Sequence, residues 1–367
     1  MRIATTARWL CILGLMAGLI QTAQAAPEVI KDVLGRSVRV DLPAKRVLLG
    51  FYFEDYMAIG GEKAFDKVVG LSREAWEGWR PANWSLFTTH RPSLKNLPDV
   101  GEVEAQTFSV EKVLALKPDV LVLAEWQYKG LGPDVKRMED AGVPVVVVDY
   151  NMELPANHHA STLLLGKIAG DEKRAQKIAD EYTSAIDQVQ SRIATAKQPR
   201  PSFYVEFGNK GPSEYSFSYG KGMWGPLGAL AGGENIAAPF VEWYGPMNPE
   251  KVLAAQPEVV FIAGTESTKN PSSMLMGQGV EPAQAQQRLQ GFAQRAGWSE
   301  LPAVKNKRLY AVYQGASRSV LDYTMVQFMA KALYPTLFKD IDPQANYLAF
   351  YRRYLPVQAK GSFALGM

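Results

Sequence analysis

A short pattern that the chain contains twice constrains its fold more than any other feature. Residues 109–124 read SVEKVLALKPDVLVLA, and residues 248–263 read NPEKVLAAQPEVVFIA in the same order. Each copy has an apolar helical stripe, then a proline that cannot continue the helix, then a nearly continuous apolar run typical of a strand covered on both faces. One copy alone would be an ordinary helix sequence. The ordered recurrence of helix, proline, acid and strand predicts two similar lobes.

The start of the chain has the features of a secretory signal peptide, which we place at residues 1–25. Arg2 and Arg8 precede an apolar run, and Ala23 and Ala25 are small residues at the positions that a signal peptidase reads. The apolar run is too short to span a bilayer well, and no anchor follows it. We therefore expect export with cleavage after Ala25, and retention in the periplasm by an outer envelope.

The composition of the remaining chain excludes several classes of function. The formal charge of the full chain is +3, and it becomes +1 once Arg2 and Arg8 are removed. Such a charge gives no indication of nucleic-acid binding. The one cysteine, Cys11, lies in the apolar run near the start. After cleavage the protein therefore has no thiol, disulfide or cysteine metal ligand.

We expect three parts after the signal peptide. Residues 26–170 form an N-terminal α/β lobe, residues 171–197 form a helix between the lobes, and residues 198–367 form a C-terminal α/β lobe. Asp171 is a plausible N-cap, and the helix that follows would extend over roughly 39 Å, long enough to cross from one lobe to the other. Alternating strands and helices predict mainly parallel sheets in both lobes.

Several other segments give weaker signals. Residues 72–98 have no clear periodicity but are rich in tryptophan, which favours a functional loop, with plugging of the core edge as the alternative. Residues 225–237 predict a helix with a glycine stop, and residues 270–287 predict a polar connection. Residues 320–338 predict a closing helix, and residues 349–355 a short terminal one.

Aromatic side chains recur just after predicted strand ends in both lobes. In open α/β sheets ligands bind outside the carboxyl ends of the strands, so two such edges facing each other would form an aromatic cleft between the lobes. Arg91 and Arg318 would neutralise an anionic ligand there. Packing explains each residue alone equally well, but the set indicates a large, flat ligand. The candidate ligand-binding residues are Tyr52, Trp76, Trp84, Arg91, Trp126, Tyr128, Tyr150, Tyr215, Trp243, Tyr313 and Arg318.

The sequence has no specific catalytic motif and little indication of a metal site. Neither HExxH nor GxSxG is present. Because adjacent side chains point in different directions, we expect His158 and His159 to be a solvated pair and not a chelating one. His90, next to Arg91, is a weak candidate for a metal ligand.

Glu111 and Glu250 occupy the same position in the two copies of the repeated pattern. An acid at the start of a helix is favoured by the helix dipole, and this alone would explain either residue. A matched acid on each lobe would also suit two basic sites on a symmetric partner.

The chain resembles the periplasmic substrate-binding proteins of ABC importers for ferric siderophores, haem and cobalamin. The resemblance covers nearly the whole chain after residue 25. It rests on DVLGRSVRVDLPAKRV near the start, EKVLALKPDVLVL at residues 111–123, the long central helix, LAGGENIA at residues 230–237, and the second EKVLA copy. It implies two α/β lobes joined by one long rigid helix, with the ligand held in a cleft between them. In that family one glutamate on each lobe docks onto arginines of the two permease subunits, and Glu111 and Glu250 match those positions.

The resemblance implies a binding protein and not an enzyme. The protein would capture an iron chelate, with a ferric siderophore as the first choice, and deliver it to an inner-membrane ABC permease dimer. Iron would arrive within the chelate, so we expect no intrinsic cofactor, and the protein would act as a monomer. Haem, cobalamin or a bare metal ion are alternative ligands, and an accessory partner of another binding protein or an exported enzyme acting on a bulky substrate are alternative functions. The identity of the chelate, the need for a second binding protein and the release mechanism stay open.

Overall fold

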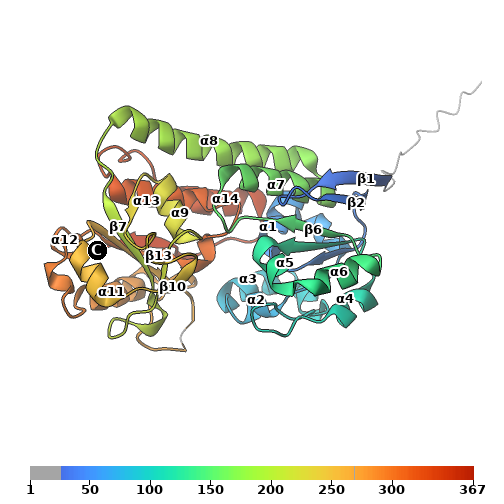
Figure 1. Cartoon of the computed structure of the whole chain (residues 1–367), viewed down its shortest axis with the longest axis horizontal. Helices are drawn as coiled ribbons and strands as arrows, with labels where there is room; N and C mark the ends of the chain where they lie inside the picture. The colour runs from blue at the N-terminus through green and yellow to red at the C-terminus, as the bar shows by residue number, and fades with distance from the viewer. Residues whose placement is uncertain (1–25, 268) are drawn as a thin grey trace, which may run out of the picture.

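The computed structural model describes residues 26–267 and 269–367. The expected signal peptide lies outside the described residues, so its cleavage stays a prediction. Two α/β lobes lie side by side, and one long helix passes over both of them (Figure 1). Within the described part of the chain, no helix combines the length and the apolar character needed to cross a membrane. The fold class expected from the repeated pattern is confirmed.

The N-terminal lobe is built on a four-stranded parallel sheet with the strand order β4-β3-β5-β6. Strands β5 and β6 are buried at every residue, as their continuous apolar runs predict. An antiparallel hairpin of β1 and β2 precedes this sheet. The elements of this lobe are β1 (Ala26–Lys31), β2 (Ser37–Leu42), β3 (Val47–Leu49), α1 (Phe53–Gly60), η1 (Glu62–Lys67), β4 (Val68–Leu71), α2 (Glu74–Glu77), α3 (Pro81–His90), η2 (Pro92–Asn96), α4 (Val110–Leu116), β5 (Val120–Ala124), α5 (Glu125–Leu131), α6 (Pro133–Asp140), β6 (Val145–Val148) and α7 (Pro155–Ala169).

The C-terminal lobe contains a seven-stranded sheet whose centre is the parallel set β7, β11 and β13. Strands β8, β10 and β15 extend this centre in antiparallel pairs, and β9 pairs in parallel with β7. The elements are β7 (Ser202–Phe207), η3 (Gly208–Lys210), β8 (Phe217–Tyr219), α9 (Trp224–Leu230), β9 (Glu234–Asn235), β10 (Tyr244–Pro246), α10 (Pro249–Ala255), β11 (Val259–Gly264), β12 (Gly277–Gln278), α11 (Pro282–Ala293), η4 (Trp298–Glu300), α12 (Pro302–Lys305), β13 (Leu309–Tyr313), η5 (Gln314–Ala316), α13 (Tyr323–Leu333), α14 (Pro343–Tyr354), β14 (Gly361–Ser362) and β15 (Ala364–Gly366).

Both copies of the repeated pattern fold in the same way. The side chains of Ser109 and Asn248 accept hydrogen bonds from backbone N–H groups and so cap α4 and α10. Both helices end in a left-handed residue, Lys117 in one copy and Gln256 in the other, directly before the proline. The strands that follow, β5 and β11, pair in parallel on both sides. The predicted duplication of helix, proline and strand is confirmed.

Helix α8 (Glu172–Ala196) is the expected helix between the lobes. The side chain of Asp171 caps it by accepting a hydrogen bond from the backbone N–H of Arg174 at 3.1 Å. One face, which includes Ile178, Tyr182 and Val189, is buried. This face packs against α7 and α1 of the first lobe and against α13 and α9 of the second, so a single helical stripe belongs to the cores of both lobes.

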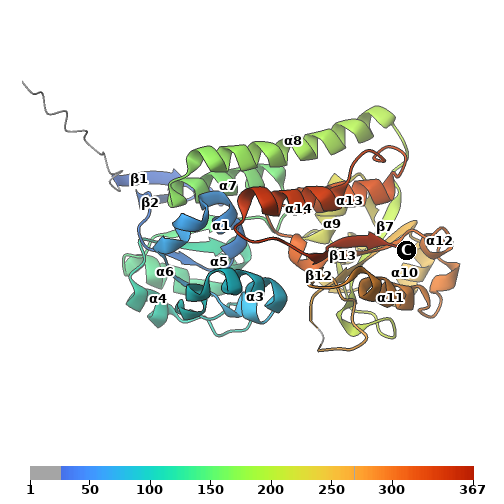
Figure 2. The same ribbon diagram turned by 180° about the vertical axis from the view of Figure 1, so that it is seen from behind.

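Helix α14 returns from the second lobe to the first. In Figure 2 it lies below α8 and points toward α1, with which it is in contact. Tyr351 of α14 donates a hydrogen bond to the buried carboxylate of Glu54 in α1. Arg174 of α8 donates to the backbone oxygens of Ala58 and Tyr354, each at 2.7 Å. Three helices from different parts of the chain thus pack together on the side of the molecule that α8 covers.

The structure differs from the sequence expectations in the connecting segments. Residues 72–98, expected as an irregular loop, contain α2, α3 and η2, which are too short to show a helical period. The helix expected over residues 225–237 ends at Leu230, because the chain turns at Gly232 with φ +87 and continues into β9. The polar connection at residues 270–287 contains β12 and the start of α11.

The end of the chain also differs from expectation. The closing helix expected over residues 320–338 is the shorter α13. The terminal helix expected over residues 349–355 is the second half of α14, which begins at Pro343 after a capping Asp342. The last residues then form β14 and β15, and β15 joins the main sheet beside β13. Two- and three-residue strands give no usable alternation, so the sequence could not indicate them.

Replacing Gly166 by alanine will test the close packing of α7 on α8. A Cβ atom at this position would lie 2.2 Å from the Cβ of Ala175, so the two helices must move apart. We expect the free energy of unfolding to fall by about 1–3 kcal/mol. The matched control is Gly291→Ala in α11, where the nearest atom to the new Cβ is Pro212 Cγ at 3.6 Å. There alanine should stabilise by about 0.5–1 kcal/mol. Urea unfolding measures both changes, and similar values for the two variants would contradict the packing argument.

Candidate functional site

A cleft with a volume of about 360 Å³ opens between the lobes. Its second-lobe wall follows the carboxyl ends of β7, β11 and β13, which is where open α/β sheets bind ligands. Its first-lobe wall comes from the turn between α2 and α3 and from the loop that precedes α4. The lining residues are Gly78, Trp79, Arg80, Glu104, Phe207, Asn209, Phe217, Tyr219, Met223, Tyr244, Thr265, Ser267, Tyr313, Gln314, Gly315 and Arg318.

Two arginines, one from each lobe, meet in this cleft around the ring of Phe51. The guanidinium carbon of Arg80 lies 5.6 Å from the centroid of that ring and 4.8 Å from the centroid of Trp76. The guanidinium carbon of Arg318 lies 5.1 Å from the centroid of Phe51. Burial, followed by the charge of Arg80, lowers the pKa of Arg318. The two cations therefore repel each other, and the carboxyl group of Glu104, which also lines the cleft, acts in the opposite direction on Arg318.

The carboxylates near the cleft leave some N–H groups of these arginines without a hydrogen-bond partner. Arg80 Nη1 lies 4.0 Å from Glu54 Oε2. Burial lowers the pKa of Arg80, but the surrounding Tyr313 and acids, Glu54 first among them, outweigh this and raise it. Among the described residues, Arg80 Nη2 and Arg318 Nε are buried without a hydrogen-bond partner. Both arginines thus retain N–H donors that an anion can occupy.

Asp55 fixes the loop that carries Arg318 to the first lobe. Its carboxylate accepts hydrogen bonds from Ser319 Oγ at 2.7 Å and from the backbone N–H of Val320 at 2.8 Å. Burial raises the pKa of Asp55, and these two hydrogen bonds act against that rise. Arg318 has φ +64, a left-handed conformation that costs a non-glycine residue about 1–3 kcal/mol. The hydrogen bonds across the lobes hold this residue where its guanidinium group enters the cleft.

Gln314 presents amide donors to the cleft in a fixed orientation. Its side-chain oxygen accepts hydrogen bonds from Trp224 Nε1 at 2.7 Å and from the Tyr219 hydroxyl at 2.9 Å. An indole N–H can only donate, so the atom that faces it is the amide oxygen. The NH₂ group of Gln314 remains available to a ligand. Nearby, the Tyr313 hydroxyl donates a hydrogen bond to Glu266 Oε1 at 2.6 Å. The hydroxyl proton of Tyr313 is therefore not available to a ligand.

Two of the predicted ligand-binding residues, Tyr313 and Arg318, line the cleft, and Trp76 lies directly behind Arg80. The other aromatic candidates do not line the cleft, and each contacts another part of its own lobe. Their contacts are Tyr52 with Asn151, Tyr150 with Thr162, Trp84 with Glu77, Trp126 with Phe51, Tyr128 with Arg36, Tyr215 with Arg295 and Trp298, and Trp243 with Gly222.

Arg91 and His90 lie outside the cleft, near the ends of α3 and η1. Arg91 donates to Asp66 Oδ1 at 2.5 Å and lines a separate small recess beside it. His90 Nε2 lies 3.0 Å from Glu62 Oε1 at the surface. Surface ion pairing accounts for both contacts.

The expectation of a solvated histidine pair is wrong for His158. Its exposed fraction is 1%, whereas His159 is partly exposed and lies 3.4 Å from Thr183 Oγ1. Burial lowers the pKa of His158 to about 3, so its ring is neutral at neutral pH. The two side chains point apart as expected, but α7 turns one of them into the protein interior.

The sequence interpretation did not select several residues that form the cleft. Arg80 and Trp79 belong to the tryptophan-rich segment that was noticed, but choosing them requires knowing how the short helices α2 and α3 turn. Phe217 and Tyr219 are separated by one residue on β8, and this spacing places both side chains on one face of a strand. That alternation was the available signal for the second-lobe wall. The missed residues are Trp79, Arg80, Glu104, Phe217, Tyr219, Tyr244 and Gln314.

Glu111 and Glu250 lie in the first turns of α4 and α10, in opposite lobes (Figure 2). Both side chains are exposed. Glu111 Oε1 lies 3.6 Å from Arg137 Nη2, and such an exposed pair is weak. Neither residue is required for packing of the cores.

A family model described as periplasmic binding protein matches residues 57–314, more than half of the chain. The chain belongs to this family. A crystal structure of the TroA-like periplasmic binding protein FepB from Veillonella parvula is 33% identical, and the match covers 93% of this chain and 100% of that one with a TM-score of 0.86. The uncharacterised ABC transporter substrate-binding lipoprotein YvrC of Bacillus subtilis is 23% identical over 87% of this chain and 90% of its own. A vitamin B12-binding protein of Yersinia pseudotuberculosis is 27% identical over 60% of this chain and 78% of its own.

The protein is therefore a periplasmic binding protein of the ABC importer class. Members of this class bind a substrate and work with a membrane permease, so the cleft between the lobes is the expected substrate site. The expectation drawn from the repeated pattern and the LAGGENIA segment is confirmed at the level of the family.

The buried carboxyl group of Glu54 predicts an unusual dependence of stability on pH. Burial raises its pKa from 4.5 to about 7, although the hydrogen bond from Tyr351 and the charge of Arg80 lower it. Its protonated form therefore stabilises the folded state fully below pH 4.5, and this contribution is lost as the pH rises through 7. Relative to Glu54→Gln, whose amide cannot ionise, the wild type should lose roughly 3 kcal/mol across this range.

Urea unfolding of both proteins between pH 4.5 and 8 measures this difference, and taking the difference cancels the titration of groups that do not interact with Glu54. Glu111→Gln serves as the control, because Glu111 is exposed and should leave the pH profile unchanged. A constant difference between wild type and Glu54→Gln over the whole range would contradict the assignment.

Proposed function

We propose that the cleft binds an anionic iron chelate, a ferric siderophore, which the protein captures in the periplasm and delivers to an inner-membrane ABC permease dimer. The observation that carries this proposal is the meeting of Arg80 and Arg318, one from each lobe, with N–H donors that have no partner in the described chain. A chelate with net negative charge would accept charge-assisted hydrogen bonds from both guanidinium groups. It would also relieve the repulsion between them.

The remaining walls of the cleft suit the organic part of such a ligand. Trp79, Phe217, Tyr219 and Tyr244 offer aromatic surface on both sides of the cleft. The NH₂ group of Gln314 adds a neutral donor. The chelator supplies the ligands of the iron, so the protein needs to recognise the outer shape and charge of the complex and not the metal itself. Iron is then cargo, and the protein has no cofactor of its own.

The size of the cleft separates the candidate ligands. Its volume of about 360 Å³ lies in the lower part of the usual range for small-molecule sites, about 300–1,000 Å³. A compact chelate would fit within this volume, whereas cobalamin would have to extend from the open side of the cleft. Cobalamin is still the natural comparison, because some relatives are named as vitamin B12-binding proteins. Haem is the second comparison, since its propionates would also pair with the arginines.

The cellular location follows from the same proposal. Removal of residues 1–25 would release a chain that begins at Ala26 and acts as a monomer in the periplasm. Size-exclusion chromatography of the exported protein and sequencing of its N-terminus test both statements.

A tryptophan-fluorescence titration of the protein lacking residues 1–25 tests the proposal directly. Trp79 lies in the cleft wall and will report ligand binding. The titrants are ferric hydroxamate, catecholate and mixed siderophores, haemin, cobalamin and free ferric ion. Saturable quenching by a ferric siderophore at micromolar concentration or below supports the proposal, whereas saturation only with haemin or cobalamin replaces the ligand and leaves the transport class intact. No response to any titrant would remove the cleft as an iron-chelate site.

Substitution of Arg318 by glutamine should weaken binding of the chelate about tenfold or more, because a charge-assisted hydrogen bond contributes roughly 1.5–3 kcal/mol. Glutamine keeps the same backbone strain at φ +64 but is shorter and uncharged, so the loss reports the whole guanidinium group. Arg91→Gln is the matched control and should bind like the wild type, because Arg91 lies in a different recess. Equal losses in both variants would contradict the placement of the ligand beside Arg318. The dissociation constants come from the same titration.

The double variant Glu111→Ala/Glu250→Ala should bind the chelate as tightly as the wild type but fail to support uptake. Both glutamates are exposed and lie on opposite lobes away from the cleft lining, so their loss removes only the proposed contacts with two basic sites on the permease. Uptake of radiolabelled iron chelate by cells that carry the cognate importer measures the effect. One exposed acid from each lobe, Asp140→Ala with Glu300→Ala, is the matched control. Undiminished uptake by the first variant would contradict docking through these residues.

A further inference from the structure

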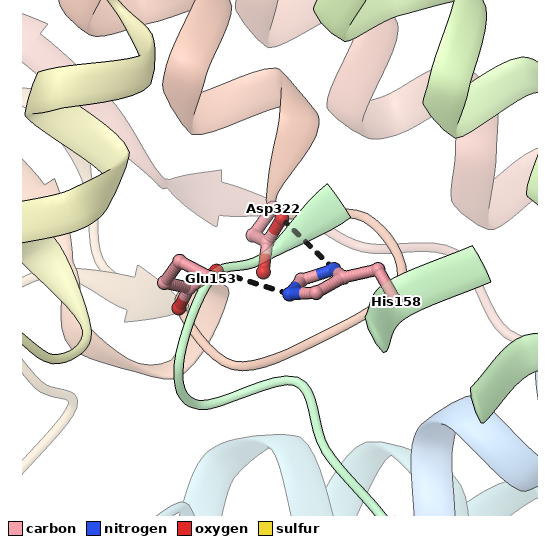
Figure 3. A group of neighbouring side chains, drawn as sticks. All are labelled: Glu153, His158 and Asp322. Atoms are coloured by element: carbon pink, nitrogen blue, oxygen red, sulfur yellow. Dashed lines mark ion pairs between the residues drawn. The ribbon is translucent and has the colours of Figure 1, made fainter. Parts of the chain in front are cut away.

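Glu153, His158 and Asp322 form a buried cluster at the junction of the two lobes (Figure 3). Glu153 lies in the loop after β6, His158 in the first turn of α7, and Asp322 directly before α13. Their exposed fractions are 1%, 1% and 0%. None of the three lines the ligand cleft, so the cluster is separate from the site of the proposed function.

The imidazole ring of His158 is held between the two carboxyl groups. Its Nε2 atom lies 3.2 Å from Glu153 Oε2, and its Nδ1 atom lies 3.8 Å from Asp322 Oδ1. The ring stacks on Tyr182 of α8, with centroids 4.7 Å apart, and meets the ring of Tyr150 edge-on. These aromatic contacts fix the orientation of the imidazole. Figure 3 shows both carboxyl groups directed toward the histidine ring.

The polar atoms of this cluster have mainly one another as neighbours. Both side-chain oxygens of Glu153, both ring nitrogens of His158, and Asp322 Oδ1 are buried without a hydrogen bond of acceptable geometry to any described residue. Burying polar groups in this way is strongly unfavourable unless a counter-charge satisfies them. Burial raises the pKa of Glu153 and Asp322 well above the ordinary range, so either protons shared within the cluster or a bound cation must satisfy these groups.

We propose that this cluster is a structural site for one divalent transition-metal cation of the Zn²⁺ type. One atom from each of Glu153, His158 and Asp322 can be chosen so that all three lie within 4.8 Å of one another. Zn²⁺ binds histidine nitrogen and carboxylate oxygen at about 2.0–2.2 Å. The three side chains therefore have to move somewhat closer together before one ion can contact all three.

Such an ion would join the lobes at a point behind the ligand cleft. Glu153 and His158 belong to the N-terminal part of the chain, and Asp322 lies at the end of the loop that carries Gln314 and Arg318 into the cleft. Asp322 Oδ2 also accepts a hydrogen bond from the backbone N–H of Ser319 at 3.2 Å. A bound cation would therefore fix this loop from its far end.

The metal content of the refolded protein tests the proposal. Untagged protein lacking residues 1–25 is unfolded in urea with a chelator, refolded with or without Zn²⁺, and freed of loose metal by gel filtration. Refolding allows the ion to enter a site that is closed in the folded state. We expect about one Zn²⁺ per chain by elemental analysis, and a thermal midpoint raised by roughly 5 °C or more over the metal-free protein. Refolding with Co²⁺ should give the visible absorption of a low-coordinate cobalt site.

Asp322→Asn and His158→Gln should reduce the bound Zn²⁺ to less than about a tenth of the wild-type content. His90→Gln and His159→Gln are the matched controls, because both histidines lie outside the cluster, and these variants should retain the metal. Circular dichroism confirms that each variant is folded, and the cobalt spectrum of the wild type provides a measurement that needs no variant. Wild-type protein that refolds without Zn²⁺ and gains no stability from it would overturn the proposal in favour of protons shared within the cluster. Unchanged zinc content in Asp322→Asn would overturn it as well.

Discussion

The contact on which the rest of the site depends is the carboxylate of Asp55 in the first lobe, which accepts two hydrogen bonds from the loop of the second lobe at Ser319 and Val320. Arg318 precedes these two residues and enters the cleft. Asp322 follows them and enters the buried cluster with His158. One short loop thus supplies a residue of the cleft lining, the contact between the lobes and a member of the buried cluster, and a single buried acid holds it against the other lobe. The strained backbone of Arg318 is tolerated because both of its flanks are fixed.

The two lobes are built from the same repeated unit, yet they contribute differently to the cleft. In the first lobe the sheet is wholly parallel, and its contribution comes from the short helices beyond β4, which supply Trp79 and Arg80. In the second lobe the antiparallel strands β8 and β10 extend the sheet and bring Phe217, Tyr219 and Tyr244 to the cleft. The duplicated core therefore sets the position of the cleft. The parts that are not duplicated determine what the cleft recognises.

The same distinction explains how much the sequence could predict. The helix, proline and strand of each copy were predictable because capping, proline and apolar runs are local signals that act within a few residues. Helix α8 was predictable for the same reason, since its buried stripe is long and regular. The placement of Arg80 was not predictable, because α2 and α3 are too short to show a helical period of apolar residues. The burial of His158 was not predictable either. It depends on Tyr182, Glu153 and Asp322, which only the folded chain brings together.

Helix α8 has a consequence for how the molecule unfolds. Its buried face belongs to both cores at once, and α14 adds a second connection through the hydrogen bond from Tyr351 to Glu54. Neither lobe can lose its core without exposing apolar surface of the other, so the free energies of the two lobes are coupled. The chain should therefore melt in one cooperative transition in spite of its two sheets. A fragment cut at the middle of α8 would leave two halves that each lack part of their own core.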